Sequence, residues 1–480
     1  MASAFPQGVL SGILVGGLNA AHARYAVISL LRLHTKRNWT RRNPLLLVTA
    51  IFAVVLFAGI VTNAQPVPAS TDTAAAAPSG ETIITEYSPP PALAAKAEAY
   101  RGALHTHFFA GTLYAWLVLL VVLFWGLGPK YRDWAERASS RRFVQVLIYA
   151  PLMLLTVSVL SLPTSIWDQM LELNFGRSVQ HWAAWWSDWL TSQIVMLIVG
   201  TLVVWILYAV IRRNPRRWWF YFWLTSVPLI ALTFFLQPLI VDPLFFKFKP
   251  LAENHPQLVE QVEQVVHHGG MDIPPDRIFE MNASTKTTEL NAYVTGFGAS
   301  KRAVLWDTLL LKATPQEALF VFGHEMGHYV LLHVPQLIAI ISLILLVLFF
   351  ISYKLVGGIL ARWGAAWKIR SIDDWASLPL LMLLLSVLAF LATPLFNAIG
   401  RHYEHEADRY GIEVIHGIVP NANQVAAHYF EKSGEINLNE ANPSEWVKIW
   451  FYDHPTRPER VHFVATYDPW TNGEKGKYVP

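Results

Sequence analysis

The segment His324-Glu325-Met326-Gly327-His328 has the residue types and spacing of a metal-dependent hydrolase. Residues four apart in an α-helix lie on one face, so His324 and His328 can bind the same zinc ion. Glu325 would stand beside the open coordination position, where it can take a proton from water and later pass it to a leaving amine. The motif predicts one bound Zn²⁺ per chain and a hydrolytic reaction with Glu325 as the general base.

The residues before this motif predict the helix that it needs. Thr314 followed by Pro315 is typical of a helix start, with a capping hydroxyl and a proline in the first turn. A chance match to the motif has a probability of roughly a few per cent. His333 would lie about 140° around a continuous helix from His328, so we expect it to point elsewhere.

A third metal ligand is expected in the segment 401–408, which follows an apolar stretch. By spacing alone, Glu404, His405 and Glu406 compete for this role. Asp408 lies one turn after Glu404 and is a candidate to orient a ligand histidine through its second ring nitrogen. The alternative interpretation of this cluster is a solvated charged helix face.

The composition indicates that these residues belong to a membrane protein. Hydrophobic residues make up 54% of the 480 residues and charged residues only 15%, against about 25% in soluble domains. Seven windows are long and apolar enough to cross a bilayer. They are Pro44–Asn63, Phe108–Leu127, Phe143–Trp167, Leu190–Ile211, Trp218–Val241, Pro335–Val356 and Ala376–Ile399. Gly8–Ala23 is expected to be an interfacial or half-inserted helix rather than an eighth span. Buried core helices are disfavoured because soluble helices average about 11–12 residues.

This pattern divides the chain into five expected parts. Residues 1–43 form a basic, interfacial segment, and residues 44–241 hold five spans with a flexible or extended Ala/Pro-rich loop at 65–98. Residues 242–334 form a catalytic region with a helix at Pro256–His268 and strands at Arg277–Asn282 and Ala303–Asp307. Residues 335–399 hold two spans, and residues 400–480 form a C-terminal catalytic region with the third ligand.

Positive charge is unequal on the two sides of these spans. Lys and Arg number 19 in the loops on one side and three in the short loops on the other. The positive-inside rule makes the first group cytoplasmic and places both catalytic regions on the opposite, extracytoplasmic side. The net charge of +3 is too small to indicate nucleic-acid binding. The absence of cysteine excludes thiolate zinc sites and a cysteine nucleophile.

Several blocks of sequence are similar to the type I CAAX prenyl proteases. The blocks are 290–297, 304–310 and 322–328, with Pro243-Leu244-Phe245, Arg401-x-x-Glu404-x-x-Ala407-Asp408, and His454-Pro455 followed by Arg460. The resemblance covers about residues 160–461. It implies an all-α integral membrane protein with seven transmembrane helices around a water-filled chamber and a mixed α+β, zincin-type catalytic region at one membrane face.

The resemblance also implies the functional residues. His324, His328 and Glu404 would be the zinc ligands and Glu325 the general base. His454 would stabilise the oxyanion, with Asp408 and Arg460 supporting the site. Asn291, Ala292 and Tyr293 would form an edge strand that pairs with an extended peptide. The alternative is that Asn291 and Tyr293 belong to an ordinary exposed strand and that His454 lies in an ordinary turn.

The expected partners are a peptide or protein substrate, possibly lipidated, and the lipid bilayer. No oligomer is implied. In the family the zinc domains face the cytosol, whereas the charge pattern here predicts the opposite side. An extracytoplasmic site favours other membrane-associated or exported peptides over prenylated ones. Membrane-protein quality control is an alternative role. A transporter or channel with a structural zinc site is a remote alternative, because the spans are almost free of charge.

Overall fold

The structure, a computed structural model, describes residues 83–271, 273–295 and 302–479. Within these residues six helices are long and apolar enough to cross a membrane. They are α3 (Pro91–Phe124), α5 (Arg142–Asn174), α6 (Trp182–Arg213), α7 (Trp218–Leu236), α12 (His333–Trp363) and α13 (Leu378–Ile415). A π-helical turn, Gln237–Val241, and α8 (Asp242–Phe245) continue α7. The windows Pro44–Asn63 and Gly8–Ala23 lie outside the described residues.

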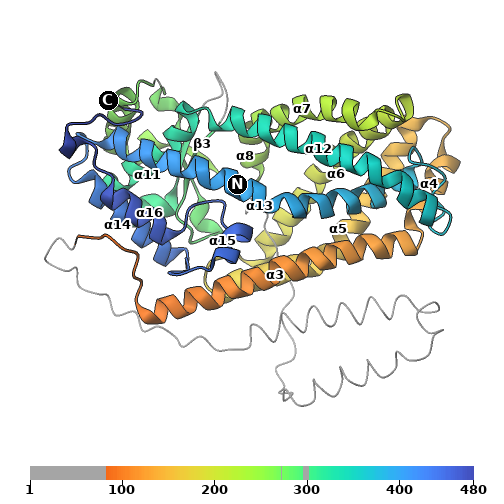
Figure 1. The fold of residues 1–480 in the computed structure, drawn as a ribbon, viewed down its shortest axis with the longest axis horizontal. Coiled ribbons are helices and arrows are strands. Elements are labelled where there is room, and N and C mark those ends of the chain that lie inside the picture. The colour runs from red at the N-terminus through yellow and green to blue at the C-terminus, as the bar shows by residue number, and fades with distance from the viewer. Residues whose placement is uncertain (1–82, 272, 296–301, 480) are drawn as a thin grey trace, which may run out of the picture.

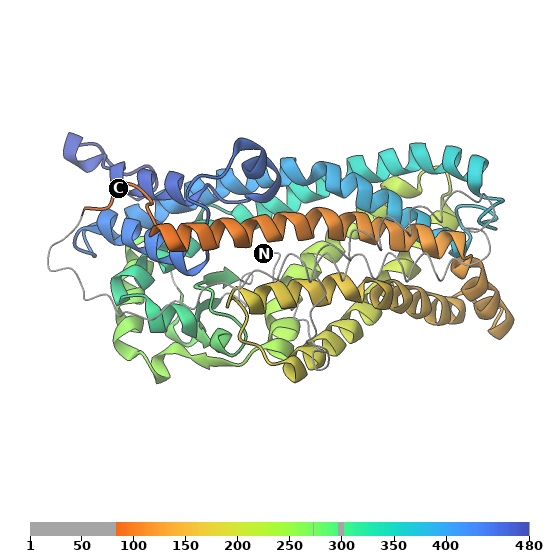
Figure 2. The same ribbon diagram turned by 90° about the horizontal axis from the view of Figure 1, so that it is seen from below.

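The six spans form a closed ring. Each of them packs against two neighbours, in the order α3, α5, α6, α7, α12, α13 and back to α3. The short helix α4 (Leu127–Ala138) joins α3 to α5 at one end of the molecule, and the catalytic elements gather at the other end (Figures 1 and 2). The ring therefore places the catalytic region beyond one end of the membrane-spanning bundle.

Both boundaries of α3 differ from the sequence predictions. α3 begins at Pro91, so the end of the loop predicted at 65–98 is helical. Pro91 occupies a helix N-terminus, where its missing N–H costs nothing, and the Ala-rich residues after it favour helix. At its other end α3 stops at Phe124, before the predicted Leu127, because Gly126 adopts a left-handed conformation with φ of 63°.

The last span carries part of the catalytic region without a break. α13 runs for 38 residues from Leu378 to Ile415 and passes through the boundary expected at 399/400. Glu404 and Asp408 therefore stand on the extension of a transmembrane helix rather than on a separate polar helix. A continuous helix fixes their position relative to the bundle more firmly than a loop would.

The catalytic region combines a small sheet with short helices. The strands are β1 (Phe248–Pro250), β2 (Ile278–Met281), β3 (Ala292–Thr295) and β4 (Arg302–Trp306), in the order β1-β2-β4-β3. β2 and β4 are parallel, and the other two pairs are antiparallel. The helices are α9 (Pro256–His268), α10 (Asp307–Lys312), α11 (Pro315–Val330), α14 (Ala422–Ile436), α15 (Glu445–Phe451) and α16 (Arg457–Thr466). The predicted helix Pro256–His268 and the two predicted strands are thereby confirmed.

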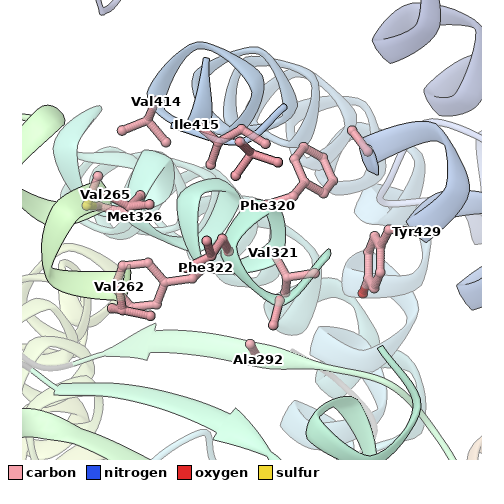
Figure 3. Packing of buried hydrophobic residues seen from close by; sticks show 14 of the residues in the cluster. Val262, Val265, Ala292, Phe320, Val321, Phe322, Met326, Val414, Ile415 and Tyr429 are labelled. Carbon is pink, nitrogen blue, oxygen red and sulfur yellow. The ribbon is translucent and has the colours of Figure 1, made fainter. Parts of the chain in front are cut away.

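The motif helix α11 lies at the centre of the catalytic region. Figure 3 shows Phe320, Val321 and Phe322 of α11 packed between Ala292 of the sheet and Ile415 of α13. Two glycines allow α11 and α13 to come close. A Cβ atom on Gly323 would lie 2.6 Å from Val414, and one on Gly411 would lie 3.0 Å from the backbone nitrogen of His324. This close approach brings the motif helix to the residues of α13.

A capping box starts α11. The Thr314 hydroxyl accepts a hydrogen bond from the Glu317 N–H at 3.2 Å, and the Glu317 carboxylate accepts one from the Thr314 N–H at 2.7 Å. Glu317 is also bound by Lys432 of α14 at 2.7 Å. We expect Thr314→Ala to lower the free energy of unfolding by about 1 kcal/mol. Denaturant titration in detergent checks this, with Thr466→Ala on the exposed end of α16 as a control; equal losses in both variants would contradict it.

Candidate active site

Three side chains from two helices meet at the predicted metal site. The Nε2 atoms of His324 and His328, both on α11, are 3.3 Å apart. The Glu404 carboxylate of α13 approaches His324 Nε2 at 3.3 Å and His328 Nε2 at 3.4 Å. One possible ligand atom from each residue lies within 4.8 Å of the others. This distance suits a single ion between them.

The other two candidates for the third ligand are directed elsewhere. The His405 ring packs against Phe463 with the ring centroids 4.3 Å apart. Glu406 forms ion pairs with Arg409 at 2.9 Å and with Lys477 at 2.7 Å. Of the three, only Glu404 lies beside the two motif histidines.

The chemistry of these three residues fits a small divalent cation. Their side chains are largely buried, with exposed fractions of 9%, 20% and 13% for His324, His328 and Glu404. The Glu404 Oε2 atom is buried and has no well-aligned hydrogen bond among the described residues, although His324 Nε2 and His454 Nε2 lie 3.3 Å and 3.1 Å from it. A buried carboxylate oxygen without a hydrogen bond is costly unless a cation neutralises it. Two imidazole nitrogens and one carboxylate oxygen are also the ligand set of many catalytic metal sites.

The ion pair between Asp408 and Arg460 lies beside His324, on the side of its Nδ1 atom. Asp408 Oδ1 lies 2.9 Å from His324 Nδ1, and the Asp408 side chain is 1% exposed. Arg460 of α16 binds the same carboxylate with two nitrogens, at 2.8 Å and 2.5 Å. The Asp408 carboxylate beside Nδ1 favours the tautomer protonated at that atom, which leaves the Nε2 atom of His324 free to bind a metal. The predicted pair is therefore brought together, and it links α11, α13 and α16.

His333 is a contact residue that the sequence interpretation missed. Its Nδ1 lies 3.1 Å from His328 Nδ1, and its ring stacks on Tyr403 with the centroids 4.5 Å apart. His333 is not among the residues of the ligand cluster, in agreement with the prediction, but the offset of about 140° does not apply because α11 ends at Val330. Leu332 then takes a left-handed conformation, and His333 begins α12. Pro335, in the first turn of α12, is the sequence signal for a new helix start here.

Glu325 lies next to the two motif histidines along α11 and is half-buried. Burial raises the pKa of its carboxyl group above the ordinary value, although the nearby His324 and His328 oppose this. A carboxylate with a raised pKa is a better proton acceptor near neutral pH. Its environment is thus suited to general-base chemistry.

His454 reaches the site from the loop between α15 and α16. Its Nε2 lies 3.1 Å from Glu404 Oε2, and its Nδ1 lies 2.7 Å from Asp453 Oδ1. Arg401 of α13 holds this loop by donating to the Tyr452 carbonyl at 2.6 Å. Gly400 allows the close contact, since a Cβ there would lie 2.6 Å from the Asp453 carbonyl oxygen. The structure therefore brings His454 to the edge of the metal site.

The predicted edge strand is present as β3. Among the described residues β3 pairs with β4 alone and so has an unpaired side. Asn291 directly precedes the strand and is exposed, and its carbonyl accepts from the Trp306 N–H at 3.2 Å. Ala292 is buried against α11, whereas the Tyr293 hydroxyl donates to Asp242 at 3.3 Å. The backbone of β3 is thus available on one side, while these two side chains pack into the protein.

Comparison with known proteins places these features in one family. The profile of peptidase family M48 matches residues 252–468, and that of the CAAX prenyl protease N-terminal region, with five membrane helices, matches residues 87–247. The uncharacterized metalloprotease YhfN of Bacillus subtilis (strain 168) is 36% identical over 371 residues, which are 77% of this chain and 85% of YhfN. The chain belongs to peptidase family M48.

Other M48-type proteins agree with this assignment. The CAAX prenyl protease 1 homolog of Dictyostelium discoideum is 28% identical over 312 residues, covering 64% of this chain and 70% of that protein. The crystal structure of S. mikatae Ste24p matches with a TM-score of 0.66 at 21% identity and covers 88% of this chain and 99% of that chain. The chain accordingly has the helical, chambered membrane fold expected from the sequence, and the CAAX-protease resemblance is confirmed.

Membership of family M48 establishes the type of protein. The chain is a multi-pass integral membrane metalloendopeptidase with a metal cofactor. This excludes the transporter or channel alternative as the main function. The His-His-Glu cluster lies in the region that the M48 profile matches. Glu325 and His454 lie in the same region but are not members of the cluster.

Proposed function

We propose that this metalloendopeptidase binds one zinc ion through His324, His328 and Glu404 and cleaves extended peptides at the membrane surface. The observation that supports this proposal is the convergence of the three ligand atoms, within 4.8 Å of one another, beside Glu325. A two-histidine, one-glutamate set leaves a fourth position open for water or substrate, as catalytic zinc sites require. Zinc analysis of the purified protein, with peptide hydrolysis before and after chelation, tests it: hydrolysis should be lost with the metal and restored by zinc.

The side chains around the site have distinct roles in the proposed reaction. When bound, zinc supplies Lewis-acid activation of water and of the peptide carbonyl. Glu325 accepts the proton of the attacking water and then delivers it to the nitrogen of the leaving amine. His454 donates a hydrogen bond to the developing oxyanion, a contribution of roughly 3–4 kcal/mol. Asp408 and Arg460 hold His324 in position.

We further propose that the substrate pairs with the free side of β3. Residues Asn291, Ala292 and Tyr293 would present backbone groups to an extended peptide, which adds as a further strand. Ala292 and Tyr293 are packed into the protein, so the backbone rather than these side chains would make the contacts. Binding of this kind selects extended peptides with little dependence on their side chains.

The location of the site bears on the natural substrate. The excess of Lys and Arg in one set of loops favours an extracytoplasmic catalytic region. We therefore propose exported or membrane-associated peptides as substrates, with membrane-protein quality control as one such role. Prenylated peptides are the second candidate, favoured by the names of the relatives.

Matched peptides with and without a farnesyl group test the choice between these two substrate classes. The first proposal expects both to be cleaved, whereas a requirement for the farnesyl group would favour the second.

A single cysteine tests the proposed orientation, because the sequence has none. Lys475 is exposed in the C-terminal catalytic region, and Ser140 is exposed between α4 and α5 at the other end. In whole cells an impermeant thiol reagent is expected to label Lys475→Cys and to label Ser140→Cys only after permeabilisation. The reverse pattern would contradict the extracytoplasmic site while leaving the proposed chemistry intact.

A further inference from the structure

The short helix α15 exposes large apolar side chains although it is not one of the six spans. Trp446 is 56% exposed and Ile449 is 44% exposed. Trp450 lies on the same helix face, since residues three and four apart are neighbours, and its ring is 5.4 Å from that of Trp446. We call Trp446, Ile449 and Trp450 the aromatic face of α15. Exposed apolar side chains that gather on one face of an extramembrane helix indicate a contact surface.

This face adjoins two transmembrane helices. The Trp450 ring lies 4.7 Å from Phe390 of α13 and 6.0 Å from Phe109 of α3. The next residue, Phe451, contacts His105 and Phe108 of α3 with centroid distances of 4.1 Å and 5.1 Å. Figure 1 shows α15 between α13 and α3. The aromatic face therefore begins at the level where the apolar part of α3 begins, which the sequence places at Phe108.

Lys448 lies on the side of α15 opposite Trp446 and Trp450, whereas Glu445 lies one turn before Ile449 at the start of the helix. Lys448 donates to Glu445 at 2.8 Å and to Glu459 of α16 at 3.1 Å. Glu445 itself is 82% exposed. A helix with tryptophan on one side and paired charges on the other has the composition of an element at the membrane–water interface. The bilayer is the apolar partner to which α3 and α13 already belong, so it is the occupant that this face fits.

We propose that α15 lies in the membrane–water interface with Trp446 and Ile449 inserted among the lipids. The helix is then a lipid-docking element of the C-terminal catalytic region. Arg401 of α13 binds the Lys448 and Tyr452 carbonyls at 3.0 Å and 2.6 Å, so α15 and the loop that follows it are held together. That loop carries His454. Docking of α15 on lipid therefore anchors the segment that brings His454 to the metal site.

Spin labelling tests this inference, because the chain has no native cysteine. The full chain with Ile449→Cys is labelled with a nitroxide and reconstituted into phosphatidylcholine vesicles. Collision rates are measured with oxygen, which concentrates in lipid, and with a water-soluble nickel chelate. Leu113→Cys, 61% exposed on α3, serves as the lipid reference, and Lys475→Cys serves as the water reference.

The proposal expects position 449 to resemble position 113, with high oxygen and low nickel accessibility. Nickel accessibility equal to that at position 475 would overturn it, because the face would then be in water. Low accessibility to both reagents would also overturn it, because another protein segment would then cover the face. Trp446→Cys gives a second, independent position, and a circular dichroism spectrum matching the parent protein confirms that each variant is folded.

Discussion

Replacing Glu325 by Gln is expected to lower the turnover number for peptide hydrolysis by about 10²–10⁴-fold while leaving the bound zinc unchanged. The amide has the shape of the carboxylate but cannot accept the proton of the attacking water. Because Glu325 is not one of the three residues whose ligand atoms converge, the zinc content should stay at the wild-type value. The two quantities are measured on the same preparation, by initial rates and by elemental analysis.

A matched control separates this effect from a general effect of removing an acidic group. Glu260→Gln changes an exposed glutamate of α9 and should leave both the turnover number and the zinc content as in the wild type. If Glu325→Gln retained wild-type turnover, the assignment of the general base would be wrong. If it lost both zinc and activity, Glu325 would act on metal binding rather than on proton transfer.

Breaking the pair between Asp408 and Arg460 is expected to have the largest effect on stability. In Arg460→Ala the Asp408 carboxylate, 1% exposed, would remain buried without its partner, at a cost of about 3–5 kcal/mol. We expect zinc affinity to fall as well, by about 10–100-fold, because Asp408 fixes the ring of His324. Denaturant unfolding and zinc titration measure the two losses separately.

A double variant distinguishes these two effects. Replacing both partners, in Asp408→Leu with Arg460→Leu, removes the unpaired charge and should recover most of the unfolding free energy, but not the zinc affinity. Arg142→Ala, which removes a surface ion pair with Glu136 at 3.7 Å, should cost less than about 1 kcal/mol. Full recovery of zinc affinity in the double variant would show that Asp408 does not orient His324.

The sequence predicted the spans and the motif helix because their signals are local. Long apolar windows identify membrane helices wherever they occur, and six of the seven windows correspond to described spans. Thr314 and Pro315 mark the start of α11, and the His-Glu-x-x-His spacing defines one helix face. These features depend on a few neighbouring residues and need no knowledge of the tertiary structure.

Features that depend on distant segments could not be predicted in this way. The spacing in 404–406 left three possible ligands, and the choice follows from how α13 crosses α11 at Gly323 and Gly411. His333 reaches His328 only because the chain turns at Leu332. Pro335 indicates a helix start nearby, but the direction of the new helix depends on its packing. The docking of α15 against α3 joins residues more than 300 positions apart in sequence. Tertiary packing, rather than local preference, decides each of these.

The most direct test of the account is the zinc content of three purified proteins: the wild type, Glu404→Gln and Glu406→Gln. Both substitutions replace a carboxylate by an amide on the same helix, two residues apart, but only Glu404 approaches the two motif histidines. The account predicts one zinc per chain in the wild type and in Glu406→Gln, and a strongly reduced content in Glu404→Gln. Undiminished zinc in Glu404→Gln, or loss of zinc only in Glu406→Gln, would contradict it.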